Sequence, residues 1–114
     1  MADRILRINQ LIKKELAEIL LKEFDSPKGS LITITKVETF ANLSQSKIYV
    51  SIIFIGKERP DVISILKKKT YSFQKSLDRR LKMRKIPKIT FFQEEETAQA
   101  AKIEEILFNL RYKK

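Results

Sequence analysis

The sequence KKKTYSFQKSLDRRLKMRKIPKI occupies residues 67–89 and joins two predicted helices to a predicted strand. Apolar side chains recur every three or four residues before and through it, as they do on one face of a helix. These side chains are Val62, Leu66, Phe73, Leu77 and Leu81. Three adjacent lysines followed by Thr70 and Ser72, which are weak helix formers, interrupt the stripe. We therefore predict a kink or a helix-turn-helix break near residues 67–72.

The second half of this stretch leads out of the helix and into a strand. We predict that the helix continues to about Arg84 and ends before Pro87, because the residue in front of a proline avoids helical geometry. The following KITFFQ, residues 88–93, alternates apolar and polar side chains with Ile89 and Phe91 on one side. This alternation predicts a third strand.

The same stretch carries most of the net charge of the chain. It holds ten cations and one acid, a charge of +9, whereas the other 14 cations of this +10 chain meet 13 acids. We call these ten residues the basic cluster: Lys67, Lys68, Lys69, Lys75, Arg79, Arg80, Lys82, Arg84, Lys85 and Lys88. A solvated helix face would not need such an excess of one sign. The cluster therefore predicts a surface that binds nucleic-acid phosphates.

A long helix is predicted at the start of the chain. Asp3 is a suitable N-cap, and DSPKG at 25–29 ends the helix because Pro27 cannot continue it. Its apolar residues, spaced by three or four, predict one buried stripe. They are Ile5, Ile8, Leu11, Ile12, Leu16, Ile19, Leu20 and Phe24.

The segments LITITKVETF (31–40) and SKIYVSIIFI (46–55) are rich in β-branched residues and predict an antiparallel hairpin. One face of the second strand should be buried, and it carries Ile48, Val50, Ile52 and Phe54. The intervening Lys47 and Ser51 should not be buried. A change of phase between Ile34 and Val37 predicts a bulge in the first strand. GKERPD then breaks the chain, with Pro60 expected in the first turn of the next helix.

Three carboxylates, Glu94, Glu95 and Glu96, precede a last predicted helix. Consecutive residues do not converge on one point, so these acids favour the start of a helix over a metal or acid-base site. The apolar side of this helix consists of Ala100, Ile103, Ile106, Leu107 and Leu110. The whole order is α-β-β-α(kink)α-β-α, which predicts an α+β fold with a three-stranded sheet and its helices packed on one face. We expect a single domain over residues 1–114, and the disposition of the final RYKK stays open.

Composition excludes several classes of function. The chain has no Cys and no His, so disulfides, thiol nucleophiles, histidine bases and the usual zinc sites are absent. No glycine-rich phosphate loop or metal-spaced cluster is present either. We therefore expect no enzyme, cofactor, metal or small-molecule substrate. No apolar run approaches the roughly 20 residues that span a bilayer, and the N-terminus does not resemble a secretory signal, so we expect a cytoplasmic protein without membrane contact.

Three aromatic residues could stack on RNA bases: Tyr71, Phe73 and Phe92. Phe73 continues the apolar stripe of its helix, so we expect it in the core. Tyr71 and Phe92 remain candidates for contact with RNA.

Several segments resemble those of one protein family. DRI at 3–5 and INQLIKKELAEIL at 8–20 are similar to its first helix, and ITITKVETFANLSQSKIYVSI at 32–52 is similar to its hairpin. Residues 76–107, SLDRRLKMRKIPKITFFQEEETAQAAKIEEIL, combine a basic helix, a proline before a strand, an acidic turn and a closing helix. In this order and spacing the segments resemble the ribosome-binding factor A family, from Asp3 to Leu110.

The resemblance implies both a fold and a function. The fold is a type II KH-like domain, which binds RNA. The family comprises bacterial assembly factors of the small ribosomal subunit. The resemblance thus implies a non-catalytic factor that binds the 30S subunit through 16S rRNA and assists late rRNA processing and subunit maturation. We expect this protein to act as a monomer.

The chain departs from the family at the predicted kink. The family carries an Ala-x-Gly element there, which falls on Lys69, Thr70 and Tyr71 in this sequence. With neither alanine nor glycine present, we expect the lysines to contact phosphate through their side chains.

Two other functions fit parts of the pattern. Residues 60–84 could form a helix-turn-helix that binds DNA, although Gln74 is the only Asn or Gln on its second helix. Alternatively, the basic surface could bind an acidic protein as an adaptor.

Overall fold

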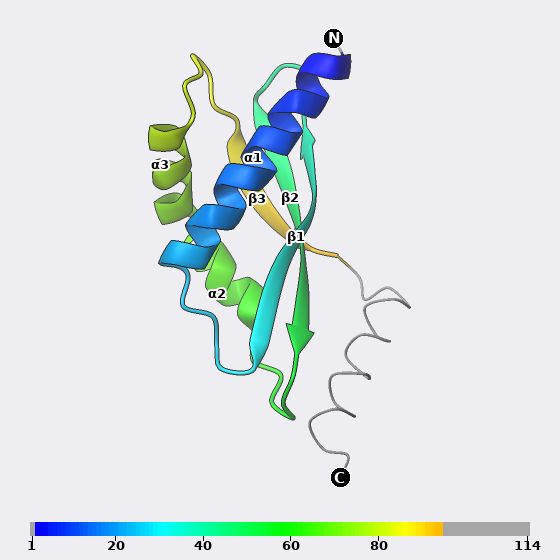
Figure 1. The fold of residues 1–114 in the computed structure, drawn as a ribbon, viewed down its shortest axis with the longest axis vertical. Helices are drawn as coiled ribbons and strands as arrows, with labels where there is room; N and C mark the ends of the chain where they lie inside the picture. Colours follow the sequence, from blue (N-terminus) through cyan, green and yellow to red (C-terminus); the bar gives the residue numbers. More distant parts are fainter. Residues whose placement is uncertain (1, 95–114) are drawn as a thin grey trace.

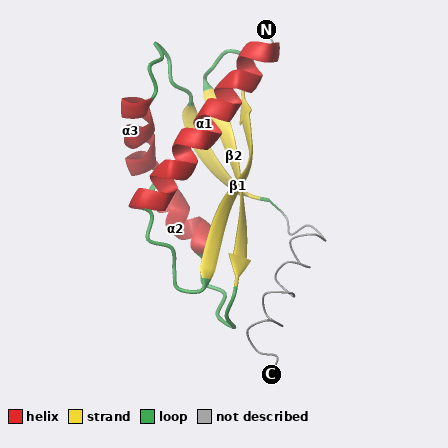
Figure 2. Ribbon diagram, viewed as in Figure 1, coloured by secondary structure: helices red, strands yellow, loops and turns green. Residues whose placement is uncertain are grey.

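The computed structural model describes residues 2–94 and contains three helices that lie on one face of a three-stranded sheet (Figures 1 and 2). The elements are α1 (Ala2–Glu23), β1 (Ser30–Thr39), β2 (Gln45–Phe54), α2 (Val62–Lys68), α3 (Thr70–Arg80) and β3 (Lys88–Gln93). This arrangement confirms the predicted α+β fold and the order of its elements as far as β3. The predicted last helix lies outside the described residues.

The sheet has the order β1-β2-β3, with β1 antiparallel to β2 and β3 parallel to β2. The register between β1 and β2 shifts between Ile34 and Lys36, so Thr35 is an extra residue in β1. The Thr35 hydroxyl donates a hydrogen bond to the carbonyl of Tyr49 at 3.2 Å. The predicted bulge is therefore confirmed.

The core fills the space between the helices and this sheet. As predicted, Ile48, Val50 and Ile52 of β2 are buried, and Phe54 is partly buried against the core. Most of the stripe predicted on α1 is buried as well. Leu11 is an exception at 40% exposure, because it lies at the border of the stripe that contacts β1 and α3.

The start of α1 differs from the prediction. The helix already includes Ala2, so Asp3 lies in its first turn and is not its N-cap. A carboxylate in the first turn still interacts favourably with the helix dipole.

The predicted kink lies between α2 and α3, at Lys69. Lys69 has φ −97° and ψ 6°, and its backbone N–H donates to the carbonyls of Leu66 and Lys67. A negative φ of this size is open to any residue. The chain therefore turns here without a glycine.

The start of α2 also differs slightly from the prediction. Asp61, and not Pro60, is next to the helix, and it is the N-cap. The Asp61 carboxylate accepts hydrogen bonds from the backbone N–H of Ser64 at 3.3 Å and from its hydroxyl at 2.7 Å. Hydrogen bonding to the charged form lowers the pKa of Asp61.

Helix α3 ends at Arg80, four residues before the predicted end at Arg84. Leu81 adopts an extended conformation, with φ −87° and ψ 129°, and is buried in the core. The helical period would carry the following residues away from the sheet. The extended segment after Leu81 instead returns the chain to the start of β3 (Figure 1).

Gln74 links α3 to the start of β3. Its side-chain amide donates to the carbonyl of Pro87 at 3.1 Å and accepts from the N–H of Ile89 at 2.8 Å. The same NH₂ group donates to Asp78 at 3.0 Å. The Gln74 side chain thus serves as a hydrogen-bond partner for a strand on one side and a helix on the other.

We predict that Gln74→Ala destabilises the protein by about 1–2 kcal/mol, because the Pro87 carbonyl and the Ile89 N–H lose their partner. Urea denaturation would measure the change. Ser72→Ala, at an exposed position of the same helix, should change stability by less than about 0.5 kcal/mol. Equal stability of Gln74→Ala and the parent protein would contradict this role for Gln74.

Candidate nucleic-acid interface

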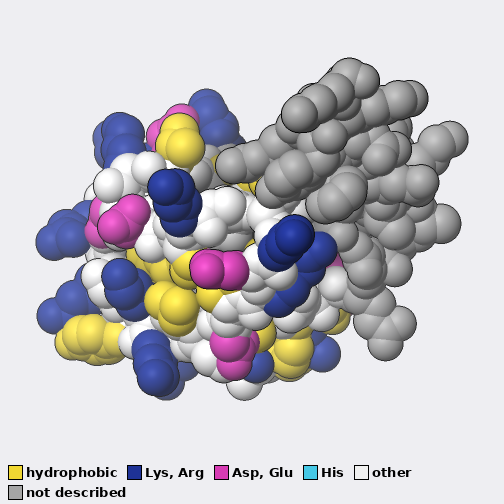
Figure 3. Space-filling view, turned by 90° about the horizontal axis from the view of Figure 1, so that it is seen from below, with side chains coloured by type: hydrophobic (Ala, Val, Ile, Leu, Met, Phe, Trp, Pro, Cys, Tyr) yellow, Lys and Arg dark blue, Asp and Glu magenta, His cyan; other side chains and the backbone are white. Residues whose placement is uncertain are grey.

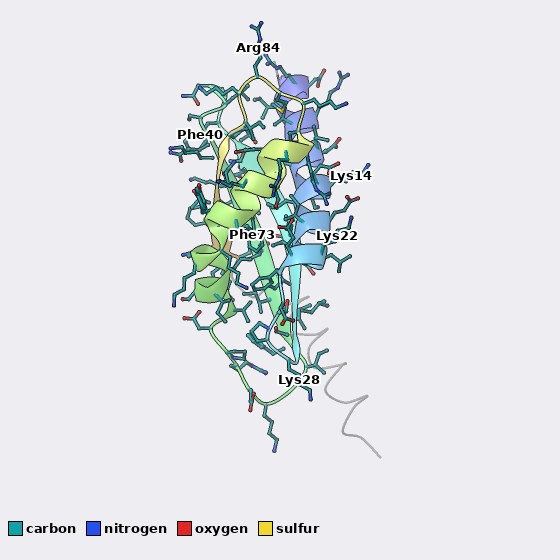
Figure 4. The ribbon with its side chains drawn as sticks, turned by 90° about the vertical axis from the view of Figure 1, so that its left-hand side faces the viewer. Lys14, Lys22, Lys28, Phe40, Phe73 and Arg84 are labelled. Carbon is teal, nitrogen blue, oxygen red and sulfur yellow. The ribbon has the colours of Figure 1, made fainter. Side chains whose placement is uncertain are left out.

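The basic cluster follows one edge of the molecule from the end of α2 to the start of β3. Figure 4 shows this edge facing the viewer, with α3 beside α1 and with Arg84 at the tip of the loop between α3 and β3. Every member of the cluster except Arg80 is exposed. The structure therefore places nine of the ten predicted cations where a large partner can reach them.

Arg80, the one member of the cluster that is not exposed, makes ion pairs that the sequence did not predict, and its predicted contact with RNA stays a prediction. Its guanidinium contacts the carboxylates of Glu15 at 3.2 Å and Glu18 at 2.9 Å, both on α1. These hydrogen bonds raise the pKa of Arg80 further above its ordinary value. Among the described residues it is the only member of the cluster with an ion pair. Arg80 therefore joins α3 to α1, which the sequence did not indicate because its partners lie more than 60 residues away.

A second polar contact joins the same two helices. The buried Ser76 hydroxyl donates to Glu23 at 2.7 Å and accepts from Arg79 at 3.4 Å. Arg79 remains exposed despite this long contact. Its guanidinium carries further N–H groups that can bind a partner.

Three other cations of the cluster contact neighbouring groups without losing their charge. The ammonium of Lys69 lies 5.6 Å from the ring centre of Phe24, and that of Lys75 lies 4.9 Å from the ring of Tyr71. Lys85 donates to the carbonyl of Asn42 at 3.2 Å, which connects the segment after α3 to the turn between β1 and β2. These contacts limit the positions of the side chains and leave their positive charge available to phosphates.

The three aromatic candidates fall into different environments. Phe73 is 1% exposed and packs edge-on against Phe24 at 5.9 Å and Phe91 at 6.2 Å, which confirms its predicted place in the core. Tyr71 is 71% exposed beside Lys75. Phe92 is 38% exposed and lies on the opposite face of the sheet from the helices. Phe92 thus cannot act together with Tyr71 on one flat ligand.

The described residues, 2–94, contain no group of three acidic, Cys or His side chains placed to hold a metal ion. Of the three consecutive glutamates, only Glu94 is within this range, and its N–H donates to the carbonyl of Val50 at 2.9 Å. Glu95 and Glu96 lie outside it. Within the same range no helix is both long enough and apolar enough to cross a membrane.

The geometry of α3 bears on the DNA-binding alternative. A recognition helix reads bases through side chains such as Asn, Gln and Arg that point away from the protein. The amide of Gln74 is instead engaged with Asp78, Pro87 and Ile89. If α3 recognised DNA bases, only its Lys and Arg side chains would therefore be available to contact them.

Comparison with known proteins identifies the family. The profile described as Ribosome-binding factor A matches residues 4–107. The chain belongs to the ribosome-binding factor A family. Ribosome-binding factor A of Bdellovibrio bacteriovorus is 34% identical over 107 residues, which cover 94% of this chain and 80% of that protein.

The fold agrees with solved structures of the same family. Ribosome-binding factor A from Thermus thermophilus superimposes with a TM-score of 0.65 at 24% identity, over 78% of this chain and 94% of that one. A homology model of the Thermus thermophilus factor, fitted into a cryo-EM map of its complex with the 30S subunit, gives a TM-score of 0.63 at 24% identity. That match covers 74% of this chain and 88% of the other. These likenesses support the KH-like description of the fold.

We predict that Arg80→Ala lowers the urea midpoint of unfolding, because Glu15 and Glu18 lose their common partner and repel each other. Arg79→Ala should leave the midpoint nearly unchanged, since Arg79 is exposed and its contact with Ser76 is long, at 3.4 Å. Equal midpoints for the two variants would contradict the assignment of Arg80 to the contact between α1 and α3.

Proposed function

We propose that this protein binds the small (30S) ribosomal subunit through 16S rRNA and assists late rRNA processing and maturation of the subunit without catalysing a reaction. Membership of the ribosome-binding factor A family supports this function. The 30S complex of the Thermus thermophilus relative supports the identity of the partner. The protein would act as a cytoplasmic monomer, with residues 1–114 forming one KH-like domain and no membrane or small-molecule ligand involved.

The observation that carries the proposal is the set of nine exposed cations between the end of α2 and the start of β3. Within residues 2–94 none of these nine is neutralised by an ion pair. Their mutual repulsion is relieved when phosphates lie along them and condensed counterions are released. Contacts of this kind position structured RNA and carry no information about its sequence.

The kink between α2 and α3 indicates how phosphate would be held. The N–H of Lys69 is already bonded to Leu66 and Lys67 within the turn. It is therefore not free to bind a phosphate oxygen. The ammonium groups of Lys67, Lys68 and Lys69 would take that role, as expected for a kink that lacks glycine.

Sedimentation through a sucrose gradient tests the ribosomal partner. We expect the protein in a cell lysate to travel with immature small subunits and not with mature 70S ribosomes. The proposed partner would be wrong if the protein stayed at the top of the gradient at low salt. An adaptor for an unrelated acidic protein would give that result.

We predict that Lys75→Gln combined with Arg79→Gln makes the negative slope of log K against log salt concentration shallower by roughly 1.4 to 1.8. This is the effect of losing about two phosphate contacts. Both residues are exposed on α3, and neither forms an ion pair within the described part of the chain. Titration of 30S subunits or 16S rRNA at several salt concentrations would measure the slope.

Lys28→Gln combined with Lys57→Gln is the matched control. Both lysines are exposed, and they lie in connecting segments that flank β1 and β2. Lys28 is at the opposite end of the molecule from Arg84 (Figure 4). Seen from this end, Lys and Arg side chains stand apart, with acidic and apolar side chains between them (Figure 3). An equal loss of slope in both double variants would show that net charge, and not the basic cluster, determines binding.

A further inference from the structure

The face of the sheet opposite the helices carries a group of aromatic and basic side chains. The strand register aligns Lys36 of β1, Tyr49 of β2 and Phe92 of β3 in one row across the sheet. The next row consists of Glu38, Lys47 and Thr90. These residues alternate with the buried ones on each strand, so they lie on the side away from the core.

The rings in this group are close together and accessible. Tyr49 and Phe92 stack with ring centres 5.7 Å apart and an angle of 30° between their planes. The ammonium of Lys47 lies 5.7 Å from the ring centre of Phe40 and 5.8 Å from that of Phe92. Phe40 is 41% exposed and Phe92 is 38% exposed. Packing within residues 2–94 does not account for the exposure of these two phenylalanines, one directly after β1 and one in β3.

The charges in the group favour an anionic ligand. The single acid of the two rows, Glu38, is paired with Lys36 at 2.6 Å and accepts from the Tyr49 hydroxyl at 3.3 Å. The Lys36 ammonium lowers the pKa of Glu38, and Glu38 raises that of Lys36. Within residues 2–94, Lys47 has no acid paired with it. Lys88 is exposed on the same face at the start of β3 and is likewise unpaired.

This face is continuous with the basic cluster. Lys88 belongs to both surfaces, and its N–H donates to the carbonyl of Ser44 at 3.2 Å. Lys85 contacts Asn42 in the same turn, which begins directly after Phe40. A strand of RNA that leaves the basic cluster at the start of β3 would therefore meet Phe40, Lys47 and Phe92 next.

We propose that the open face of the sheet is a second RNA site, which binds unpaired nucleotides. Bases would stack on Phe40 and Phe92, with the stacked Tyr49 supporting Phe92, and Lys47 would turn its flexible side chain towards a phosphate. Aromatic rings with interleaved cations bind single-stranded RNA because every base has a face that can stack on a ring. The inference rests on the proposed binding of RNA and adds single-stranded RNA as the ligand of a separate surface.

The test compares two RNAs and two double variants of the full-length protein. Fluorescence anisotropy would measure the affinity for an oligouridine of about ten nucleotides and for a blunt RNA duplex at the same salt concentration. We expect Phe40→Leu with Phe92→Leu to weaken binding of the single strand by roughly 5-fold or more, the effect of losing a stacked base. Binding of the duplex should stay within a factor of about two, since a duplex offers no free base face. Lys75→Gln with Arg79→Gln should weaken binding of both the single strand and the duplex.

Phe40→Tyr with Phe92→Tyr is the conservative control, because it keeps both rings and should retain the affinity for oligouridine. Unchanged binding of the single strand by the leucine variant would overturn the sheet site while leaving the basic cluster intact. The sheet site would also be overturned if the leucine variant lost equal affinity for the single strand and the duplex. The same holds if the tyrosine variant lost as much affinity for oligouridine as the leucine variant. A lower melting temperature of the leucine variant with unaltered RNA binding would show that the face packs against protein, including this chain's own residues, and does not bind RNA. If the Lys75→Gln with Arg79→Gln variant bound both RNAs as tightly as the parent protein, that result would count against the proposed function.

Discussion

The parallel pairing of β3 with β2 is the constraint on which the rest of this structure depends. Two parallel strands cannot be joined by a tight turn, so the chain must cross from one end of the sheet to the other. Here α2 and α3 make that crossing, and they pack on the same face of the sheet as α1, against β3, whereas α1 packs against β1. Gln74 of α3 fixes the end of this crossing, because its side-chain amide forms hydrogen bonds with Pro87 and Ile89 where β3 begins. The position of α3 therefore depends on a strand that follows it in the sequence.

The crossing also explains where the positive charge lies. The inner side of α2 and α3 packs against the sheet and α1 through Leu66, Phe73 and Leu77, so their cations are confined to the outer side. The exception is Arg80, whose charge is balanced by Glu15 and Glu18 of α1. One cation thus strengthens the fold, and the others remain available to a partner. Which cations are paired within the fold and which are exposed thus depends on the side of the helix that each residue occupies.

Local patterns in the sequence predicted much of this fold. The strands, the bulge at Thr35 and the kink at Lys69 follow from periodicity and from helix propensity over a few neighbouring residues. The end of α3 was misplaced because the apolar stripe includes Leu81, which is buried in an extended conformation. The basic cluster was visible as a charge excess, whereas its RNA-binding role stays a prediction. The roles of Arg80 and Gln74 depend on partners distant in sequence, and no local pattern contains that information.

The kink without glycine has a consequence for the unfolded chain. Where the resemblance to the family led us to expect Ala-x-Gly, this chain has Lys69, Thr70 and Tyr71, and the turn is made at a negative φ. Glycine samples far more backbone conformations than other residues, so its absence lowers the conformational entropy lost on folding, by roughly 0.4–1 kcal/mol per site. Backbone freedom at the turn is reduced for the same reason. The angle between α2 and α3 should therefore vary less in solution than in relatives with glycine, and an RNA partner would meet a hinge that is already stiff.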